Sequence, residues 1–184
     1  MKKFTVLFLA LFCLFSFSAN AQMSGGATLG LQAPIGDFAD GAKMGVGINL
    51  FGKYMLNDNM AVGANLGYNR FGAEDFGWDE VDYNASFSMI PITGLFEYHF
   101  GGSSLKPYVG ADLGIYRFGM RVKYEGESES ESELYFGLAP VAGITYDINE
   151  TLKFIANLKL HNVFAEDESL SWIGINAGVI IPFN

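Results

Sequence analysis

Four charged residues lie inside otherwise apolar or glycine-rich stretches of the sequence: Lys53, Glu97, Asp112 and Lys159. Side chains of these types can pair with one another, line an ion path or transfer protons. Charges surrounded by apolar residues are stable only when they are paired and hydrogen-bonded. We therefore expect a structural network of ion pairs. A charged path for small ions is the less favoured alternative.

The two histidines, His99 and His161, do not form an HxH or HxxxH motif, so they predict no metal site. A hydrolase would need a nucleophile beside its histidine, and Asn162 and Val163 supply none after His161. The sequence therefore predicts a non-enzymatic protein without catalytic residues, metal ligands or cofactors.

The charged positions belong to a repeated pattern. VGANLGYNRFG (62–72) and VGADLGIYRFG (109–119) agree at Val, Gly, Ala, Leu, Gly, Arg, Phe and Gly. Asn65, Asp112 and Asn157 occupy matching contexts in this pattern. Apolar residues alternate with small or polar ones throughout, which is the period of a β-strand with one apolar face.

Eight such segments are predicted as strands, at 26–33, 45–56, 60–68, 88–100, 107–124, 134–148, 152–163 and 171–183. Tight turns (57–59, 101–104, 149–150) alternate with longer acidic loops (34–44, 72–85, 125–133, 164–170). This asymmetry is typical of a transmembrane β-barrel. We predict an all-β fold, an eight-stranded antiparallel up-and-down transmembrane β-barrel with both termini on the short-turn, periplasmic side.

An eight-stranded barrel has an interior just wide enough for side chains. Glycines gather on the face opposite the apolar one and leave space there for longer polar side chains. That face is predicted to be the lumen, with a structural polar network formed by Lys53, Asn65, Glu97, Asp112, Asn157 and Lys159. Asp112 is expected to pair with Lys53 or Lys159, and the apolar face is expected to contact lipid.

Aromatic residues mark the expected edge of the apolar band. Tyr54, Tyr98 and Tyr146 each precede a tight turn. On the outer face they would form a periplasmic aromatic girdle, as such residues do at membrane interfaces.

Arg70 and Arg117 end the two repeats and are candidate cations at the membrane interface. After Ile115 the apolar residues change parity. A β-bulge near Tyr116 would produce this change and turn Arg117 into the lumen. Alternatively, Arg117 faces outward at the headgroup level, toward lipopolysaccharide phosphates. The sequence leaves both alternatives open.

The N-terminal segment has the features of a secretory signal peptide: Lys2 and Lys3, an apolar run over 4–17, and a small-x-small site at Ala19-Asn20-Ala21. We expect residues 1–21 to be cleaved and 22–184 to form the barrel domain. Cleavage removes Cys13, the only cysteine, which excludes disulfides. It also removes 2 of 11 basic residues and none of the 20 acidic ones, which leaves a net charge of −11. That charge argues against nucleic acid as a partner.

At this level the chain resembles the small outer-membrane β-barrel proteins of the OmpA/OmpX-like, "porin family" type. The resemblance covers the mature chain and rests on its glycine-rich strands, on GLQAPIGDFADG (30–41) and on KYMLNDNMAVGANLGYNRFG (53–72). It implies a location in the Gram-negative outer membrane and assembly by the barrel-assembly machinery. Members often end in a terminal aromatic residue, whereas here Asn184 follows Phe183.

The resemblance and the filled lumen together predict a role in envelope structure or surface interaction through acidic extracellular loops, such as GESESESE (126–133). The expected partners are outer-membrane lipid and lipopolysaccharide, with divalent cations at the acidic loops, and the barrel is expected to be a monomer. The alternative is a porin-like barrel that transports small or hydrophobic solutes, for which Pro91 and Pro140 within strands are a weak indication. An outer-membrane lipid hydrolase is less favoured, since no motif supports it.

Overall fold

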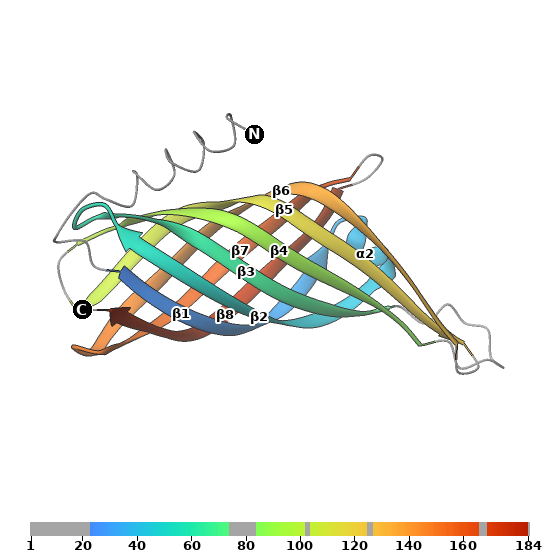
Figure 1. Cartoon of the computed structure of the whole chain (residues 1–184), viewed down its shortest axis with the longest axis horizontal. Coiled ribbons are helices and arrows are strands. Elements are labelled where there is room, and N and C mark those ends of the chain that lie inside the picture. Colours follow the sequence, from blue (N-terminus) through green and yellow to red (C-terminus); the bar gives the residue numbers. More distant parts are fainter. Residues whose placement is uncertain (1–22, 74–83, 102–103, 125–126, 166–168, 184) are drawn as a thin grey trace, which may run out of the picture.

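The computed structural model describes residues 23–73, 84–101, 104–124, 127–165 and 169–183, which form one closed β-barrel (Figure 1). Every strand pairs antiparallel with its neighbours in the sequence, and β1 pairs with β8 to close the barrel. The elements are β1 (Met23–Ile35), α2 (Phe38–Gly41), β2 (Ala42–Met55), β3 (Met60–Ala73), β4 (Asn84–His99), β5 (Leu105–Tyr124), β6 (Glu127–Asn149), β7 (Leu152–Phe164) and β8 (Ser169–Phe183). The predicted eight-stranded up-and-down barrel is confirmed.

The two ends of the barrel differ. β1 begins and β8 ends at one end, called here the turn end, and α2 lies at the opposite end, called the α2 end (Figure 1). Side chains shape the tight turns: Asn57 Oδ1 accepts hydrogen bonds from the N–H groups of Asn59 and Met60, each at 2.9 Å. Asn149 Oδ1 accepts in the same way from the Thr151 N–H group. Such Asx turns reverse the chain within a few residues.

Side chains alternate between the two faces of every strand. On β1 and β2, Leu29 is 65% and Val46 62% exposed on the outer surface, whereas Thr28 and Asn49 are 3% and 4% exposed inside. The lumen is therefore the face that carries the polar residues and glycines. Some glycines there are required by close strand approach, since a Cβ on Gly178 would overlap the Ala27 carbonyl oxygen.

Two predicted loops contain regular structure. The 34–44 segment holds the short helix α2, and β2 begins at Ala42. The 125–133 segment was expected to be a loop, but β6 begins at Glu127 and pairs with β5 from Tyr124↔Glu127 onward. Its alternation of Glu and Ser has the period of a strand, and β5 extends far enough to supply a partner for that part of the chain.

Of the two alternatives left open for Arg117, the structure does not contain the β-bulge near Tyr116. Pairing of β5 with β6 runs without a shift through Tyr116↔Tyr135, Arg117↔Leu134 and Phe118↔Glu133. Arg117 is consequently exposed on the outer surface, on the same face as Ile115. The change of apolar parity has another cause, which lies in the lumen.

Several predictions fall on other parts of the chain. The predicted signal peptide (1–21) lies outside the described residues, as do many acids of the expected loops: Glu74, Asp75, Asp79, Glu80, Asp82, Glu166, Asp167 and Glu168. Among the described elements, no helix is long and apolar enough to cross a membrane.

Candidate functional site

The lumen opens at the turn end into a cavity of about 800 Å³, called here the vestibule. Its wall includes Ser24, Lys106, Thr145 and Lys153, and its inner end is formed by Lys53 and His99. Asp147 lies between the two wall lysines, with 3.7 Å between its carboxylate and Lys106 Nζ and 3.0 Å to Lys153 Nζ. The side chains of these ion pairs are about one third exposed, and Asp147 Oδ1 has no hydrogen-bond partner of regular geometry.

A triad of Lys53, Glu97 and His99 closes the inner end of the vestibule. Lys53 Nζ lies 2.7 and 2.8 Å from the two carboxylate oxygens of Glu97, and His99 Nε2 lies 3.1 Å from Glu97 Oε2. The Lys53 ammonium also lies over the rings of Phe51 and Tyr108, at 4.6 and 5.2 Å from their centroids. The buried carboxylate is thus shared between two partners, while aromatic faces surround the ammonium group.

A second ion pair lies deeper in the lumen. Lys159 Nζ donates to Asp112 Oδ2 at 2.7 Å, and both side chains are buried. Asp112 was expected to pair with Lys53 or Lys159, and its partner in the structure is Lys159. The space between the two ion pairs is a cavity of about 10 Å³, which is room for about one water molecule. An open ion path is therefore absent from the described part of the lumen.

A chain of side-chain hydrogen bonds continues from the ion pairs toward the α2 end. Asn157 Nδ2 donates to the Tyr108 hydroxyl at 3.0 Å, and Asn176 Nδ2 donates to Asn157 Oδ1 at 3.0 Å. Gln32 Nε2 donates to Asn176 Oδ1 at 3.0 Å, and Trp172 Nε1 donates to Gln32 Oε1 at 3.1 Å. Satisfied networks of this kind hold a polar interior in one arrangement.

The amide network includes residues that sequence reasoning missed. Gln32, Tyr108 and Asn176 were not among the predicted lumen residues, although strand parity places each of them on the inner face. Asn65, which was predicted, donates weakly to Thr93 Oγ1 at 3.4 Å. Applying the period-two pattern to every polar residue, and not only to the repeats, would have placed Gln32, Tyr108 and Asn176 in the lumen as well.

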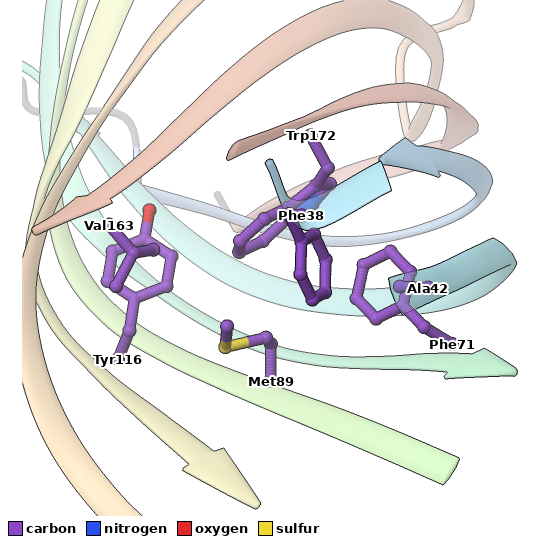
Figure 2. Close-up of a cluster of buried hydrophobic side chains, with 7 residues drawn as sticks. All are labelled: Phe38, Ala42, Phe71, Met89, Tyr116, Val163 and Trp172. Carbon is purple, nitrogen blue, oxygen red and sulfur yellow. The ribbon is translucent and has the colours of Figure 1, made fainter. Parts of the chain in front are cut away.

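At the α2 end the lumen is filled by an aromatic layer, which comprises Phe38, Phe71, Phe87, Tyr116, Phe118 and Trp172. Phe38 reaches in from α2, 5.1 Å from Phe71 and 6.3 Å from Trp172 between ring centroids. Phe71 and Trp172 also contact each other at 5.6 Å, so the three rings form one group (Figure 2). Ala42, Met89 and Val163 complete the buried cluster. This layer seals the end opposite the vestibule.

His161 is part of this seal. Its ring stacks on Trp172 with 4.4 Å between centroids, and its Nδ1 lies 3.1 Å from the Tyr116 hydroxyl. His161 is fully buried and far along the barrel from His99, which borders the vestibule. Among the residues that the structure describes, no group of three His, Cys, Asp or Glu side chains could hold a metal ion.

The aromatic layer also explains the change of parity after Ile115. Phe118 points inward and stacks on Phe87 with 5.9 Å between centroids. The interior is polar in its middle and aromatic at the α2 end, so the inner face of β5 changes from polar to apolar along one continuous strand. A bulge would be needed only if the interior were polar along its whole length, and the aromatic layer shows that it is not.

The other predicted site residues lie on the outer surface. Tyr98 and Tyr146 are exposed near the turn end, and Tyr54 is partly buried there. Arg70 and Arg117 are exposed near the α2 end, and Arg117 Nη2 donates to Ser132 Oγ at 3.1 Å. The structure therefore separates the predicted residues into an inner network and two outer groups at opposite ends.

Comparisons with known proteins agree with this architecture. The family model of the outer membrane protein β-barrel domain matches residues 4–181. A similar solved structure is Neisserial surface protein A, with a TM-score of 0.61 and 17% identity over 89% of this chain and 97% of that chain. No curated protein sequence matches the chain.

Two other solved structures have the same fold. A major outer membrane protein from Thermus thermophilus aligns with a TM-score of 0.66 and 12% identity, over 89% of this chain and 100% of that one. Ail, the attachment invasion locus protein of Yersinia pestis, solved in complex with the heparin analogue sucrose octasulfate, aligns with a TM-score of 0.55 and 18% identity, over 89% and 97%.

Proposed function

Because this chain belongs to the outer membrane protein β-barrel domain family and lies in the outer membrane, we propose that it is a non-conducting, non-enzymatic barrel acting in envelope structure or surface interaction. The observation that carries the proposal is the double closure of the lumen. The ion pairs Lys53–Glu97 and Asp112–Lys159 close its middle, and the aromatic layer closes the α2 end.

We infer the orientation from the short turns, which lie on the periplasmic side of outer-membrane barrels. The even number of strands puts both termini at that turn end and leaves the α2 end outside. Surface interaction would then use the acidic segments that follow β3 and β7 and the tip of the β5–β6 hairpin. Ail binds a polyanion in its solved complex, but the acidic excess of this chain opposes such a ligand. A partner bridged by divalent cations fits the charge better.

Conductance in planar lipid bilayers tests the closed lumen directly. The wild-type barrel is expected to show no stable channel, since both closures must be removed to open a path. A variant that lacks both, Phe38→Ala/Trp172→Ala with Lys53→Ala/Glu97→Ala and Asp112→Ala/Lys159→Ala, is the positive control and should conduct if it folds. A stable channel formed by the wild-type protein would contradict the proposal irrespective of the variant.

Divalent-cation binding tests the surface role. Replacing Glu127, Glu129, Glu131 and Glu133 with glutamine should weaken Ca²⁺- or Mg²⁺-dependent binding of the barrel to anionic surfaces. Folding of the variant is checked by heat-dependent mobility in gels. Equal binding by wild type and variant, with and without a chelator, would contradict a role for these acids.

One observation favours transport as a second candidate. Pairing of β3 with β4 stops at Leu66↔Ile92 and resumes at Asn69↔Met89, beside Pro91. Pairing of β6 with β7 is interrupted in the same way beside Pro140, between Leu138 and Val141. Proline lacks an N–H group and weakens the ladder locally, which would suit a lateral exit for small hydrophobic solutes. Uptake that is unchanged by deleting the gene would exclude this candidate.

A further inference from the structure

The wall of the vestibule has a charged part and an apolar part. Lys106 of β5 and Lys153 of β7 line the charged part. Met55 of β2 lines the apolar part, together with Ile180 and Pro182 of β8. In the closed order of strands, β5 to β7 form one arc of the wall, and β8, β1 and β2 form the next. The cavity therefore presents cations to one side of an occupant and hydrocarbon to another.

Positive charge exceeds negative charge on the arc from β5 to β7. Lys106 and Lys153 share the carboxylate of Asp147, so the two ammonium groups are only half neutralised. Of the described residues that line the vestibule, Asp58 is the acidic one, and it is exposed in the turn between β2 and β3, at the mouth of the cavity. Solvent screens a charge in such a position. The charged arc therefore favours an anion.

Lys106 is the cation that an anionic ligand can engage with the least loss. Its Nζ lies 3.7 Å from Asp147 Oδ2, which is longer than a charge-assisted hydrogen bond. Lys153 Nζ, in contrast, lies 3.0 Å from Asp147 Oδ1. The Lys106 side chain is 32% exposed, so its ammonium group contacts water. A ligand that replaces this water gains a hydrogen bond to a cation without breaking a short ion pair.

The inner end of the vestibule limits the ligand to one negative charge. Lys53 already contacts both carboxylate oxygens of Glu97, and both side chains are buried. A second anionic group at this depth would meet the Glu97 carboxylate without a cation to balance it. A carboxylate carries a single charge, whereas a phosphate monoester carries between one and two near neutral pH. The charges of the cavity therefore fit a carboxylate.

We propose that the vestibule is a binding site for a small carboxylate with a short apolar tail. The carboxylate accepts a hydrogen bond from Lys106 Nζ, and the tail lies against Met55, Ile180 and Pro182. The volume of about 800 Å³ is in the range of small-molecule sites, and apolar walls with a few polar groups are typical of them. Because ion pairs close the inner end, the ligand enters and leaves at the turn end. The site is independent of the proposed surface role.

Binding is measured by NMR on the full barrel in lipid nanodiscs, with isotope-labelled methionine methyl groups and hexanoate as the probe. The Met55 methyl resonance should shift with hexanoate concentration until it saturates. Met44 is exposed on the outer surface, so its methyl group reports on hexanoate that merely enters the lipid, and it should not follow the same curve. Hexanol, the uncharged analogue, should bind about tenfold more weakly, since it lacks the charge-assisted hydrogen bond.

Two substitutions should change the affinity in opposite directions. Lys106→Gln should weaken hexanoate binding about tenfold, which is the same loss as removing the charge from the ligand. Asp147→Asn should strengthen it about threefold, because the competing carboxylate is gone while both lysines remain. Arg70→Gln removes an exposed cation outside the vestibule. It is the matched control and should bind hexanoate like wild type.

A Met55 resonance that does not shift would overturn the proposal, and so would equal affinities for hexanoate and hexanol. Unchanged binding by Lys106→Gln, an equal loss in Arg70→Gln, or weaker binding by Asp147→Asn would also overturn it, because the charged arc would then not recognise the carboxylate. Equal shifts of Met44 and Met55 would show partition into lipid instead of a site. Bilayer conductance of the wild-type barrel reports on the closed lumen separately, so the two proposals can fail independently.

Discussion

Buried charges in this barrel are held by specific partners, and removing one partner should cost more than removing both. Asp112→Ala leaves the Lys159 ammonium buried and unpaired, which is expected to lower the free energy of unfolding by about 3–5 kcal/mol. The double variant Asp112→Leu/Lys159→Met should be destabilised much less, because both desolvated charges are gone. Urea unfolding in detergent micelles, followed by fluorescence, measures each value.

The partly exposed ion pairs of Asp147 at the vestibule can be compared with the buried Asp112–Lys159 pair. Lys106→Gln removes one of the two lysines beside Asp147, whose side chains are about one third exposed. It should change the unfolding free energy by at most about 1 kcal/mol, since solvent screens such pairs. A larger effect for Lys106→Gln than for Asp112→Ala would contradict the assignment of the inner ion pair as the more buried one.

Glycines on the two faces should tolerate alanine very differently. A Cβ on Gly178 meets the Ala27 carbonyl oxygen, whereas a Cβ on Gly52, on the outer surface, has no atom within 4 Å. Gly178→Ala is expected to cost about 1–3 kcal/mol through overpacking. Gly52→Ala should be neutral or stabilising by up to about 1 kcal/mol, since glycine weakens a strand interior. Equal unfolding midpoints for the two variants would contradict this account.

At the scale of elements, α2 depends on a single side chain. A four-residue helix is not stable by itself, and α2 is held at the barrel end by packing of Phe38 against Phe71, Phe87 and Trp172.

Phe38→Ala is therefore expected to release the 36–41 segment, seen as faster amide hydrogen exchange there and about 3–5 kcal/mol of lost packing. The exposed Asp40 on the same helix offers a control, and Asp40→Ala should leave exchange unchanged. Unaltered protection in Phe38→Ala would show that the segment is held by other contacts.

At the scale of the whole molecule, the lumen consists of an open vestibule and a closed interior. Ser24 and Thr28 test this division, because both lie on the inner face of β1, and Ser24 lines the vestibule while Thr28 borders the small inner cavity. If residues 1–21 are cleaved, no other cysteine remains in either single variant.

A membrane-impermeant thiol reagent should label Ser24→Cys readily and only from the periplasmic side. Thr28→Cys should react slower by about two orders of magnitude or more, because the reagent reaches it only after an opening of the barrel. Labelling in urea confirms that both thiols are reactive. Equal rates in the folded barrel would mean that the interior is open, and labelling of Ser24→Cys from outside would reverse the orientation.

The sequence by itself determined the architecture. Every predicted strand has a period of two, and the number of segments is even. After residue 21 the sequence has no apolar run long enough to span a membrane as a helix. An up-and-down barrel is then the way to pair all backbone groups in lipid. Parity also places Lys53, Glu97, Asp112 and Lys159 on the inner face, where the structure shows them buried. Local pattern sufficed because the inward or outward direction of a strand residue depends only on its position in the strand.

Only the tertiary structure decided which residues meet. Asp112 pairs with Lys159 and Glu97 with Lys53 because partners come from strands far apart in sequence, whose tilt and stagger set their relative heights in the barrel. The aromatic layer could not be predicted from the sequence for the same reason. Phe38, Phe71 and Trp172 belong to three distant segments that meet at one end of the barrel. The direction of Arg117 also depended on that convergence, since a single continuous strand can face a polar interior below and an aromatic one above.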